Sequence, residues 1–496
     1  MGIRVYPEKR EFLQLAKTYN LIPVYAEVIC DIDTPISLYY KLARGGYSFL
    51  LESVEGAEKW ARYSFIGTNP FLIFKSKGKE VYTRFKNSNS FEERNYSSEN
   101  PFEELKRLVT SFKSPVLPGV PRFFGGAVGY VSYESVRFFE KIPAGQDTLG
   151  FYDLYFLFPE LVLAYDRFDH SLKIIFNARI SANPEEVYET AVKEISEVIR
   201  KLNSECIKPE SLNFKGDTEV TPVPEMSKEE FMDIVKKAKE YIAQGDVIQV
   251  VLSQRFQVKS DLPGFLVYRA LRKVNPSPYL FFLELEDECL IGSSPEILVR
   301  MEGDRVETRP IAGTRKRGGT EEEDLALEKE LCSDEKELAE HMMLVDLGRN
   351  DIGRVCKYGS VEVYELMVVE RYSHVMHLVS GVRGEAKENV DMFDVFAATF
   401  PAGTVSGAPK IRAMEIICEL EKRVRGPYAG AVGYFGFSGN MDFCITIRTV
   451  FKKADTFYIQ AGAGIVADSV PEKEYEETLN KAKAIFKALN LVKEFC

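Results

Sequence analysis

Residues that could bind a small anion gather near the C-terminal end of the sequence. Tyr428 and Arg448 supply a hydroxyl and a guanidinium, and the stretch from Gly462 to Gly464 predicts a turn whose backbone N–H groups form a nest. Guanidinium and free N–H groups bind carboxylates. Glu474 and Glu477 follow in a predicted helix, and carboxylates of this kind bind hard cations such as Mg²⁺. The run predicts a site for a small polyanion held partly through a metal ion.

A second helix with paired glutamates is predicted in the run SDEKELAEHMMLVDLGRND. Glu337 and Glu340 are three residues apart and share one helix face. Charges on helices are usually solvated, but the mostly apolar residues 342–347 indicate a largely buried helix, in which a carboxylate needs a partner. For Glu474 and Glu477 the alternative is a solvated first turn stabilised by the helix dipole. Two glutamate-bearing helices together make a Mg²⁺ site competitive with that alternative.

Three other motifs limit the chemistry. GAGIVA at 462–467 fits a dinucleotide pattern, but only one helix remains after it, so no βαβ unit can form. GTVSGAPK at 403–410 lacks the Gly-Lys-Ser/Thr ending of a P-loop. His374 and His377 are three residues apart, which suits either a metal pair with further ligands or one structural histidine and one proton carrier.

Composition excludes several classes of function. The 496 residues carry a net charge of −11, with acidic and basic residues interspersed and no Lys/Arg stripe, which disfavours nucleic acid as a partner. No apolar run approaches the length of a membrane span, so no membrane association is expected. The eight cysteines include no C-x-x-C pair. A reduced, cytoplasmic protein without a zinc site is the simplest interpretation.

The elements that must position these residues predict an α+β fold with large antiparallel sheets flanked by helices, because strand and helix lengths vary and many strands sit in hairpins. Residues 205–226 carry four prolines and little periodicity, and are the predicted linker. This divides the chain into an N-terminal domain, 1–204, and a C-terminal domain, 227–496.

Local signals predict individual elements. Ser227 and Glu230 match a capping box that begins a helix, and Lys77-Gly78 predicts a hairpin turn. Residues 86–100 are polar and are predicted to form a surface loop. The pentapeptide GAVGY occurs at 126–130 and again at 430–434, which indicates either a duplicated strand-turn or a coincidence of shared strand chemistry.

Over nearly its whole length the sequence resembles the chorismate-utilising enzymes, and within them the large subunits of anthranilate synthase. The motifs that carry the resemblance are LLES (50–53), NPSPY (275–279), SPE (294–296), PIAGTRKRG (310–318), AEHMMLVDLGRND (339–351), RYSHVMHLVSG (371–381), FPAGTVSGAPK (400–410), RGPYAGAVGY (425–434), DFCITIRT (442–449), QAGAGIV (460–466) and EYEETLNKA (474–482).

The resemblance implies conversion of chorismate and ammonia to anthranilate and pyruvate with Mg²⁺, the step that opens tryptophan biosynthesis. It implies that Glu296 protonates the departing C4 hydroxyl and that His377 serves the later elimination of pyruvate. For Glu296 the alternative is a salt-bridged carboxylate at a strand turn. The implied metal ligands are Glu340 and Glu477, with Glu474 as a helper, and the implied substrate contacts are Gly313, Thr314, Tyr428, Arg448, Gly462, Ala463 and Gly464.

Two positions separate this sequence from related families. Aminodeoxychorismate synthases commonly carry a nucleophilic lysine where Ala312 stands, so that covalent route is closed. Isochorismate and salicylate synthases carry a lysine where Gln249 stands, and a glutamine cannot act as a base near neutral pH. The pair favours amination at C2. An aminodeoxychorismate synthase component and a non-catalytic tryptophan-sensing scaffold are the alternative functions.

The resemblance also implies partners. Because the chain has no glutamine amidotransferase domain, a separate amidotransferase subunit (component II) is expected to deliver ammonia in a heterodimer or heterotetramer. The N-terminal part resembles a smaller α/β regulatory domain, packed against the catalytic one, that binds tryptophan as a feedback inhibitor. The residues that match its pocket are Glu52, Ser53, Pro278, Tyr279 and Leu280.

Overall fold

A computed structural model of the chain describes residues 4–53, 62–87, 90–180, 183–204, 220–372 and 375–492. The helices are α1 (Lys9–Leu15), α2 (Pro35–Leu42), α3 (Pro101–Ser111), α4 (Pro184–Ser204), α5 (Lys228–Ala243), α6 (Gly264–Val274), α7 (Glu321–Ser333), α8 (Glu335–Gly353), α9 (Met392–Thr399), α10 (Lys410–Glu421) and α11 (Pro471–Leu491). The strands are β1 (Leu21–Ile29), β2 (Ser48–Glu52), β3 (Tyr63–Lys77), β4 (Glu80–Lys86), β5 (Phe91–Ser97), β6 (Gly126–Val131), β7 (Leu154–Asp166), β8 (Ser171–Arg179), β9 (Val223–Pro224), β10 (Gln249–Lys259), β11 (Tyr279–Leu285), β12 (Glu288–Ser294), β13 (Ile297–Glu302), β14 (Arg305–Thr308), β15 (Ile311–Lys316), β16 (Glu362–Arg371), β17 (Val375–Glu385), β18 (Gly407–Ala408), β19 (Ala431–Gly436), β20 (Met441–Ile445), β21 (Thr449–Lys453) and β22 (Thr456–Ile465).

Two arms of antiparallel sheet start from the long central pair β3 and β7. The first arm continues from β3 through β2, β11, β12, β21 and β22 to β10. The second arm continues from β7 through β6, β19, β20, β13 and β14 to β17, which also pairs with β15 and β16. The predicted α+β fold with large antiparallel sheets and flanking helices is confirmed.

Each arm contains strands from both of the predicted domains. In the first arm β2 pairs with β11, and in the second arm β6 pairs with β19. Residues 205–219 of the predicted linker lie outside the described residues, and its end forms β9, which pairs with β10. The division into two domains at 205–226 therefore stays a prediction.

The repeated GAVGY segments lie side by side in the second arm. Gly129 of β6 stands opposite Gly433 of β19. A Cβ on Gly129 would lie 1.8 Å from the carbonyl oxygen of Tyr155, and one on Gly433 would lie 2.0 Å from that of Asp442. Each glycine thus allows the next strand of the sheet to approach, which gives both segments the same steric reason for a glycine at this position, and their origin by duplication stays untested.

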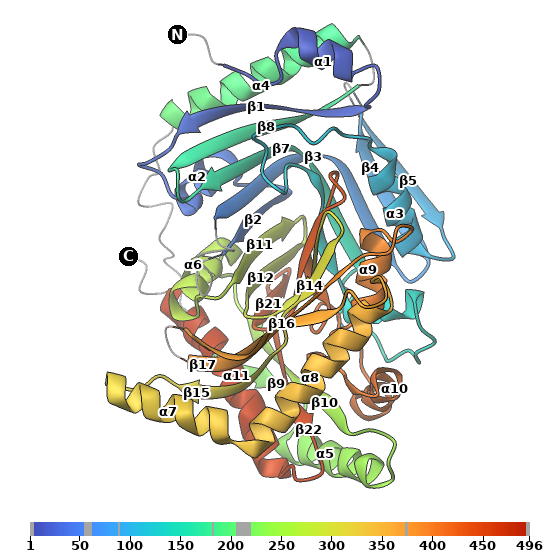
Figure 1. Cartoon of the computed structure of the whole chain (residues 1–496), viewed down its shortest axis with the longest axis vertical. Coiled ribbons are helices and arrows are strands. Elements are labelled where there is room, and N and C mark those ends of the chain that lie inside the picture. Colours follow the sequence, from blue (N-terminus) through green and yellow to red (C-terminus); the bar gives the residue numbers. More distant parts are fainter. Residues whose placement is uncertain are drawn as a thin grey trace.

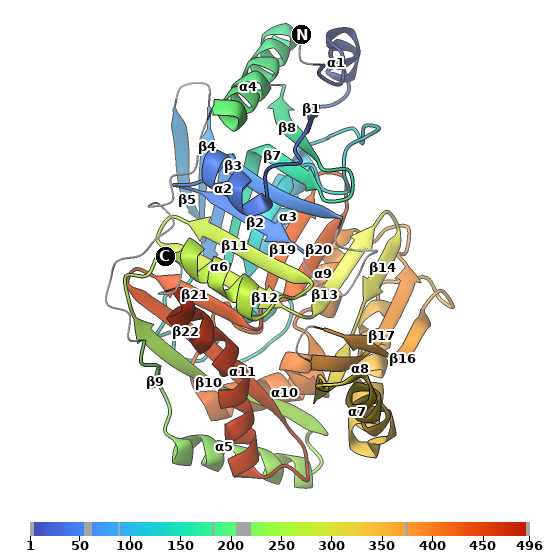
Figure 2. The same cartoon turned by 90° about the vertical axis from the view of Figure 1, so that its left-hand side faces the viewer.

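Apolar side chains fill the space between the arms and beneath the helices. One buried cluster joins aromatic and aliphatic residues of β3, β6 and β7 to those of β11, β19 and β20. A second cluster lies under α2, α4, α6 and α11. Figure 1 shows α1 and α4 beside β1 and β8 at one end of the molecule, with α5 and α7 at the opposite end. Figure 2 shows α11 crossing in front of β22 and β10.

Local predictions have mixed outcomes. The capping box is present, since Ser227 Oγ accepts the N–H of Glu230 at 3.1 Å and the Glu230 carboxylate accepts the N–H of Ser227 at 2.7 Å. The hairpin turn at Lys77-Gly78 is also present, with β3 and β4 on either side of it. The prediction that residues 86–100 form a loop is wrong, because Phe91–Ser97 form β5, paired with β4. Within the described part of the chain, no helix is both long and apolar enough to cross a membrane.

Candidate active site

The candidate site lies where the chain crosses between the two arms. Glu296 stands in the link from β12 of the first arm to β13 of the second, and Arg448 stands in the link back from β20 to β21. Backbone hydrogen bonds hold the two links: the N–H of Ile445 donates to the carbonyl of Glu296 at 3.0 Å, and the N–H of Ser293 donates to the carbonyl of Arg448 at 3.2 Å. The backbones of Glu296 and Arg448 are thereby held in the two links between the arms.

The Glu296 side chain is buried, and burial raises its pKa to about 8. The Thr404 side chain and the backbone N–H of Ile311 lower the pKa, and the more distant charge of Lys481 also lowers it, but burial outweighs them. Among the described residues, no arginine, lysine or histidine forms a salt bridge with this carboxyl. The alternative of a salt-bridged carboxylate at a strand turn therefore receives no support, and the group carries its proton at neutral pH.

His377 is oriented by the strand beside it. Its Nδ1 lies 3.0 Å from the carbonyl oxygen of Gly313 and 3.0 Å from Oγ1 of Thr314. Since a carbonyl can only accept, Nδ1 carries the hydrogen and Nε2 keeps its lone pair. Burial lowers the pKa of His377. The neutral ring can therefore accept a proton at Nε2. His374, the other histidine of this motif, lies outside the described residues.

The bulge that holds His377 depends on a glycine. Gly313 has φ +68° at the point where the register between β15 and β17 shifts. That backbone conformation favours glycine. The bulge turns the Gly313 carbonyl toward the imidazole, so these two predicted site residues and Thr314 come together in the structure.

The predicted backbone nest at 462–464 is wrong. Gly462, Ala463 and Gly464 belong to β22 and pair in an antiparallel ladder with Ser253, Leu252 and Val251 of β10. The glycines are required by neighbouring side chains rather than by a turn. A Cβ on Gly462 would lie 2.7 Å from Oη of Tyr428, and one on Gly464 would lie 2.5 Å from Nε2 of Gln249.

Tyr428 and Arg448 do come near this strand. The carbonyl of Gly462 accepts a hydrogen bond from Lys481 Nζ at 2.9 Å, so Gly462 turns its polar groups away from β10. Arg448 donates from Nη1 to the carbonyl of Lys481 at 2.5 Å. The phenol, the guanidinium and the outward-facing backbone of Gly462 are thus gathered beside α11.

The predicted metal ligands converge from α8 and α11. Oε1 of Glu340 accepts a hydrogen bond from Nε2 of Gln249 at 3.3 Å. Burial raises the pKa of Glu340, and the negative charges of Glu337 and Glu477 raise it further. Glu477 is half-exposed and lies 2.6 Å from Lys481 Nζ.

Glu474 differs from the sequence-based alternative of a solvated first turn. Its side chain is buried, and burial raises its pKa while Ser469 lowers it. Within the described ranges, no group of three or more His, Cys, Asp or Glu side chains is close enough to form a full metal-ligand set. Mg²⁺ in proteins keeps several waters and needs only one or two carboxylates together with a substrate oxygen. The two like-charged glutamates Glu340 and Glu477 fit that requirement.

The five residues matched to an inhibitor pocket line one cavity, between β2 and β11. They are Glu52, Ser53, Pro278, Tyr279 and Leu280. The charge of the Glu52 carboxylate is already compensated by other side chains. Tyr268 donates a hydrogen bond to it at 2.6 Å, and Arg167 and Arg272 each donate one at 3.1 Å. Other walls come from residues that the motifs did not single out, among them Tyr63, Phe65, Arg300, Tyr434 and Asp442.

Three residues that were not among the predicted site residues contact or neighbour the predicted site. Thr404 faces Glu296, and Lys481 joins Glu477 to Gly462. Arg425 is fully buried beside Tyr428, with its guanidinium carbon 5.7 Å from the ring centroid. Thr404, Arg425 and Lys481 all lie inside motifs that carried the resemblance, but a pairing between distant motifs leaves no signal in a single sequence.

Comparisons with known proteins place the chain in one family. A family model described as chorismate binding enzyme matches residues 51–487. Anthranilate synthase component 1 of Acetivibrio thermocellus is 52% identical over 493 residues, with 98% of each chain covered. Its counterpart in Aquifex aeolicus (strain VF5) is 51% identical at the same coverage. The crystal structure of anthranilate synthase component I from Streptococcus pneumoniae TIGR4 superposes with a TM-score of 0.76 at 38% identity, over 92% of this chain and 98% of that one.

Proposed function

This chain belongs to the chorismate binding enzyme family, and we propose that it is the chorismate-converting component of an anthranilate synthase. It adds ammonia to C2 of chorismate, expels the C4 hydroxyl, and then eliminates pyruvate to give anthranilate. The observation that carries this proposal is Glu296, a buried carboxyl with a pKa raised to about 8, which therefore keeps its proton at neutral pH.

Glu296 acts in the first step as the general acid. Hydroxide is a poor leaving group, so the C4 oxygen must receive a proton as its bond to carbon breaks and the ring double bonds shift. A carboxyl with its ordinary pKa would be ionised near pH 7 and could not supply that proton. The raised pKa of about 8 leaves Glu296 protonated for this purpose.

Arg448, Tyr428 and the backbone of Gly462 bind the substrate. Chorismate carries two carboxylates, and the guanidinium and phenol can each donate hydrogen bonds to one of them. The Arg448 guanidinium stays charged although burial lowers its pKa. Holding the dianion fixed places C2 for attack by ammonia and C4 next to the acid.

His377 acts in the second step as a base. With Nδ1 bound to the Gly313 carbonyl, Nε2 takes the proton from C2 of the aminated ring. The electron pair of that C–H bond completes the aromatic ring as the C3–O bond breaks, and the enolpyruvyl group leaves as pyruvate after proton uptake. Burial, which lowers the pKa of His377, keeps the ring neutral and ready to accept the proton.

Glu340 and Glu477, with Glu474 as a helper, would hold Mg²⁺. The ion would neutralise a substrate carboxylate and favour attack on the ring. Apart from the ion, Glu340 also orients Gln249, whose amide can hydrogen-bond but cannot serve as a base.

Ammonia is scarce at neutral pH, and the component 1 names of the relatives support a second, amidotransferase component that releases it from glutamine. The cavity beside Ser53 is proposed to bind tryptophan as a feedback inhibitor. Residues 1–204 would then form the regulatory part and 227–496 the catalytic part. The cysteines Cys30, Cys289, Cys332, Cys356, Cys418 and Cys444 are free, in keeping with a proposed cytoplasmic location.

The test uses the purified full chain with chorismate, Mg²⁺ and ammonium at mildly alkaline pH. We expect blue anthranilate fluorescence to grow with time, and mass spectrometry to identify anthranilate and pyruvate in equal amounts. The matched control is Glu296→Gln, which keeps the side-chain shape without the acid proton. A folded wild-type chain that leaves chorismate unchanged, or that releases an aminated product without pyruvate, would contradict the proposal.

A further inference from the structure

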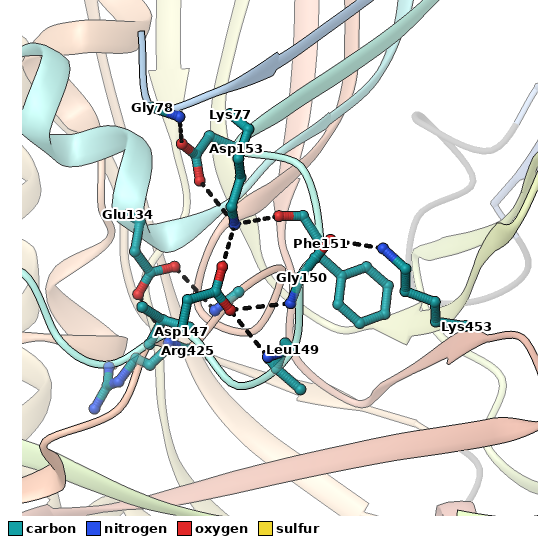
Figure 3. Close-up of polar contacts among 12 residues, drawn as sticks. Lys77, Gly78, Glu134, Asp147, Leu149, Gly150, Phe151, Asp153, Arg425 and Lys453 are labelled. Atoms are coloured by element: carbon teal, nitrogen blue, oxygen red, sulfur yellow. Dashed lines mark hydrogen bonds and ion pairs between the residues drawn. The ribbon is translucent and has the colours of Figure 1, made fainter. Parts of the chain in front are cut away.

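A carboxylate from the N-terminal part of the chain holds the loop that carries Tyr428. Glu134 lies in a short 3-10 helix, Tyr133–Phe138, after β6. Its Oε1 accepts the backbone N–H of Arg425 at 2.8 Å, and its Oε2 accepts the N–H of Gly426 at 2.9 Å (Figure 3). The N–H of Tyr133 also donates to the carbonyl of Gly426 at 2.9 Å. One carboxylate thus receives two consecutive backbone N–H groups.

The Arg425 side chain ties the same loop to the candidate site. Its Nη1 donates to the carbonyl of Val405 and its Nη2 to the carbonyl of Val251, each at 2.8 Å. Its Nε and Nη2 bind the Glu421 carboxylate at 2.9 and 2.6 Å. Val405 follows Thr404, the residue that faces Glu296. Arg425 therefore joins the loop to β10 and to the neighbourhood of the catalytic acid.

The segment from Tyr133 to Gly150, which carries Glu134, is held by hydrogen bonds and an ion pair at several points. Gln146 pairs with Lys422 and Val424 through backbone hydrogen bonds of 3.0 Å each. The Asp147 carboxylate accepts the N–H groups of Leu149 and Gly150 at 2.9 and 3.0 Å, and it lies 2.6 Å from Lys77 Nζ (Figure 3). The Gly150 carbonyl accepts from Lys453 Nζ at 2.6 Å. The segment spans from the β3–β4 turn to the loop after α10.

The loop must be held at this position because Tyr428 fits tightly. Its side chain is buried, and its Oη would lie only 2.7 Å from a Cβ on Gly462. Between Arg425 and Tyr428 the chain turns at Gly426, which has φ +62°. A shift of Gly426 would therefore move the phenol relative to β22, where the substrate carboxylate is proposed to bind.

We propose that Glu134 is a positioning residue for chorismate binding, which acts by fixing residues 425–428 through its two backbone hydrogen bonds and touches no substrate itself. This inference rests on the proposed function, because it takes chorismate as the ligand of Tyr428. It assigns to the part of the chain before the predicted linker a direct role in the geometry of the catalytic site.

The central variant is Glu134→Gln. The amide oxygen can accept one N–H, but the amide NH₂ then faces the other backbone donor, which is left without an acceptor. We expect the KM for chorismate to rise about tenfold, because displacement of a binding group by a fraction of an ångström already costs rate and affinity. The KM for ammonia should change little, whereas the melting temperature should fall, because one backbone N–H loses its acceptor. The control is Glu140→Gln, a carboxylate of the same segment, which should change neither constant.

A double-mutant cycle separates positioning from a general structural role. If Glu134 acts through Tyr428, Glu134→Gln should raise the chorismate KM far less in a Tyr428→Phe background than in the wild type. The inference would be overturned if Glu134→Gln raised the chorismate KM by the same factor in the Tyr428→Phe background as in the wild type. An unchanged KM in Glu134→Gln would also overturn it. Should Glu134→Gln fold poorly, the same cycle is run with Glu134→Asp, which keeps both carboxylate oxygens. A wild-type chain without turnover would overturn the proposed function, and the inference with it, whereas an active wild type with an unaffected variant overturns the inference alone.

Discussion

Gln249 of β10 donates a hydrogen bond from Nε2 to Oε1 of Glu340 on α8, at 3.3 Å and across 91 positions of sequence. This contact joins the end of the first arm to the helix that carries a proposed metal ligand. It leaves the other carboxylate oxygen of Glu340 without a contact to Gln249. An amide carries no charge that would neutralise the carboxylate, and its hydrogen bond lowers the pKa of Glu340, which favours the charged form that binds a cation.

Replacing Glu340 should therefore weaken the response to Mg²⁺. We expect Glu340→Gln to lose most activity and to need about 10- to 100-fold more Mg²⁺ for half of its remaining maximum. The melting temperature of the wild type should rise with added Mg²⁺ in the presence of chorismate, and that rise should be smaller in the variant. Glu335→Gln, an exposed position in the first turn of α8, is the control. An unchanged Mg²⁺ dependence in Glu340→Gln would contradict the ligand role.

The reaction should lose rate as pH rises through about 8. Glu296 has a raised pKa of about 8, so it is protonated below that value and ionised above it. Only the protonated form can serve the leaving hydroxyl, so kcat/KM for chorismate should fall about tenfold per pH unit on the alkaline side. The concentration of free ammonia must be held constant across the series, since it also changes with pH. A rate that is independent of pH from 7 to 10 would exclude Glu296 as the acid.

Local features could be predicted from the sequence, whereas contacts between distant segments could not. The capping box at Ser227 lies within one helical turn and is predicted by the sequence, but the bulge at Gly313 is not, because it depends on the pairing of β15 with β17. The identity of Glu340 and Glu477 as a pair came only from the resemblance, because their helices are joined by no local pattern. Glu134 could not be found at all, since a carboxylate that binds backbone N–H groups requires no particular partner side chain.

Two wrong predictions have different physical causes. The strand Phe91–Ser97 is almost wholly exposed, so it has no alternation of apolar and polar residues by which a strand is recognised. At 462–464 the glycines predict a turn, whereas in the structure they leave room for Tyr428 and Gln249 within a regular strand. A glycine in a sequence can be required either by an unusual backbone angle or by a close neighbouring atom. Only the structure distinguishes the two.

A methyl group added at Gly462 should damage substrate binding. The new Cβ would lie 2.7 Å from Oη of Tyr428 and 3.0 Å from the carbonyl oxygen of Leu252, so the phenol would have to move. We expect Gly462→Ala to raise the chorismate KM at least about tenfold. Gly353→Ala is the control, because a Cβ there meets nothing within 4 Å. Adding Tyr428→Phe should relieve part of the structural strain, visible as a higher melting temperature than that of Gly462→Ala alone, and no such recovery would contradict the proposed clash.

Filling the cavity beside Ser53 should abolish the response to tryptophan while sparing catalysis. The walls include the aromatic rings of Tyr63, Phe65 and Tyr434, which suit an indole, and the charged pair Arg300 and Asp442. Neither Glu296 nor Arg448 lines this cavity. We expect Ser53→Phe to lose tryptophan binding in calorimetry and to keep chorismate turnover within about twofold of the wild type, since surface-facing changes away from a site cost little. Ser333→Phe on the exposed face of α7 should retain both properties. Tryptophan that binds the Ser53→Phe variant as tightly as the wild type would place the inhibitor elsewhere, and equal loss of turnover and binding would show that the two sites are not separable.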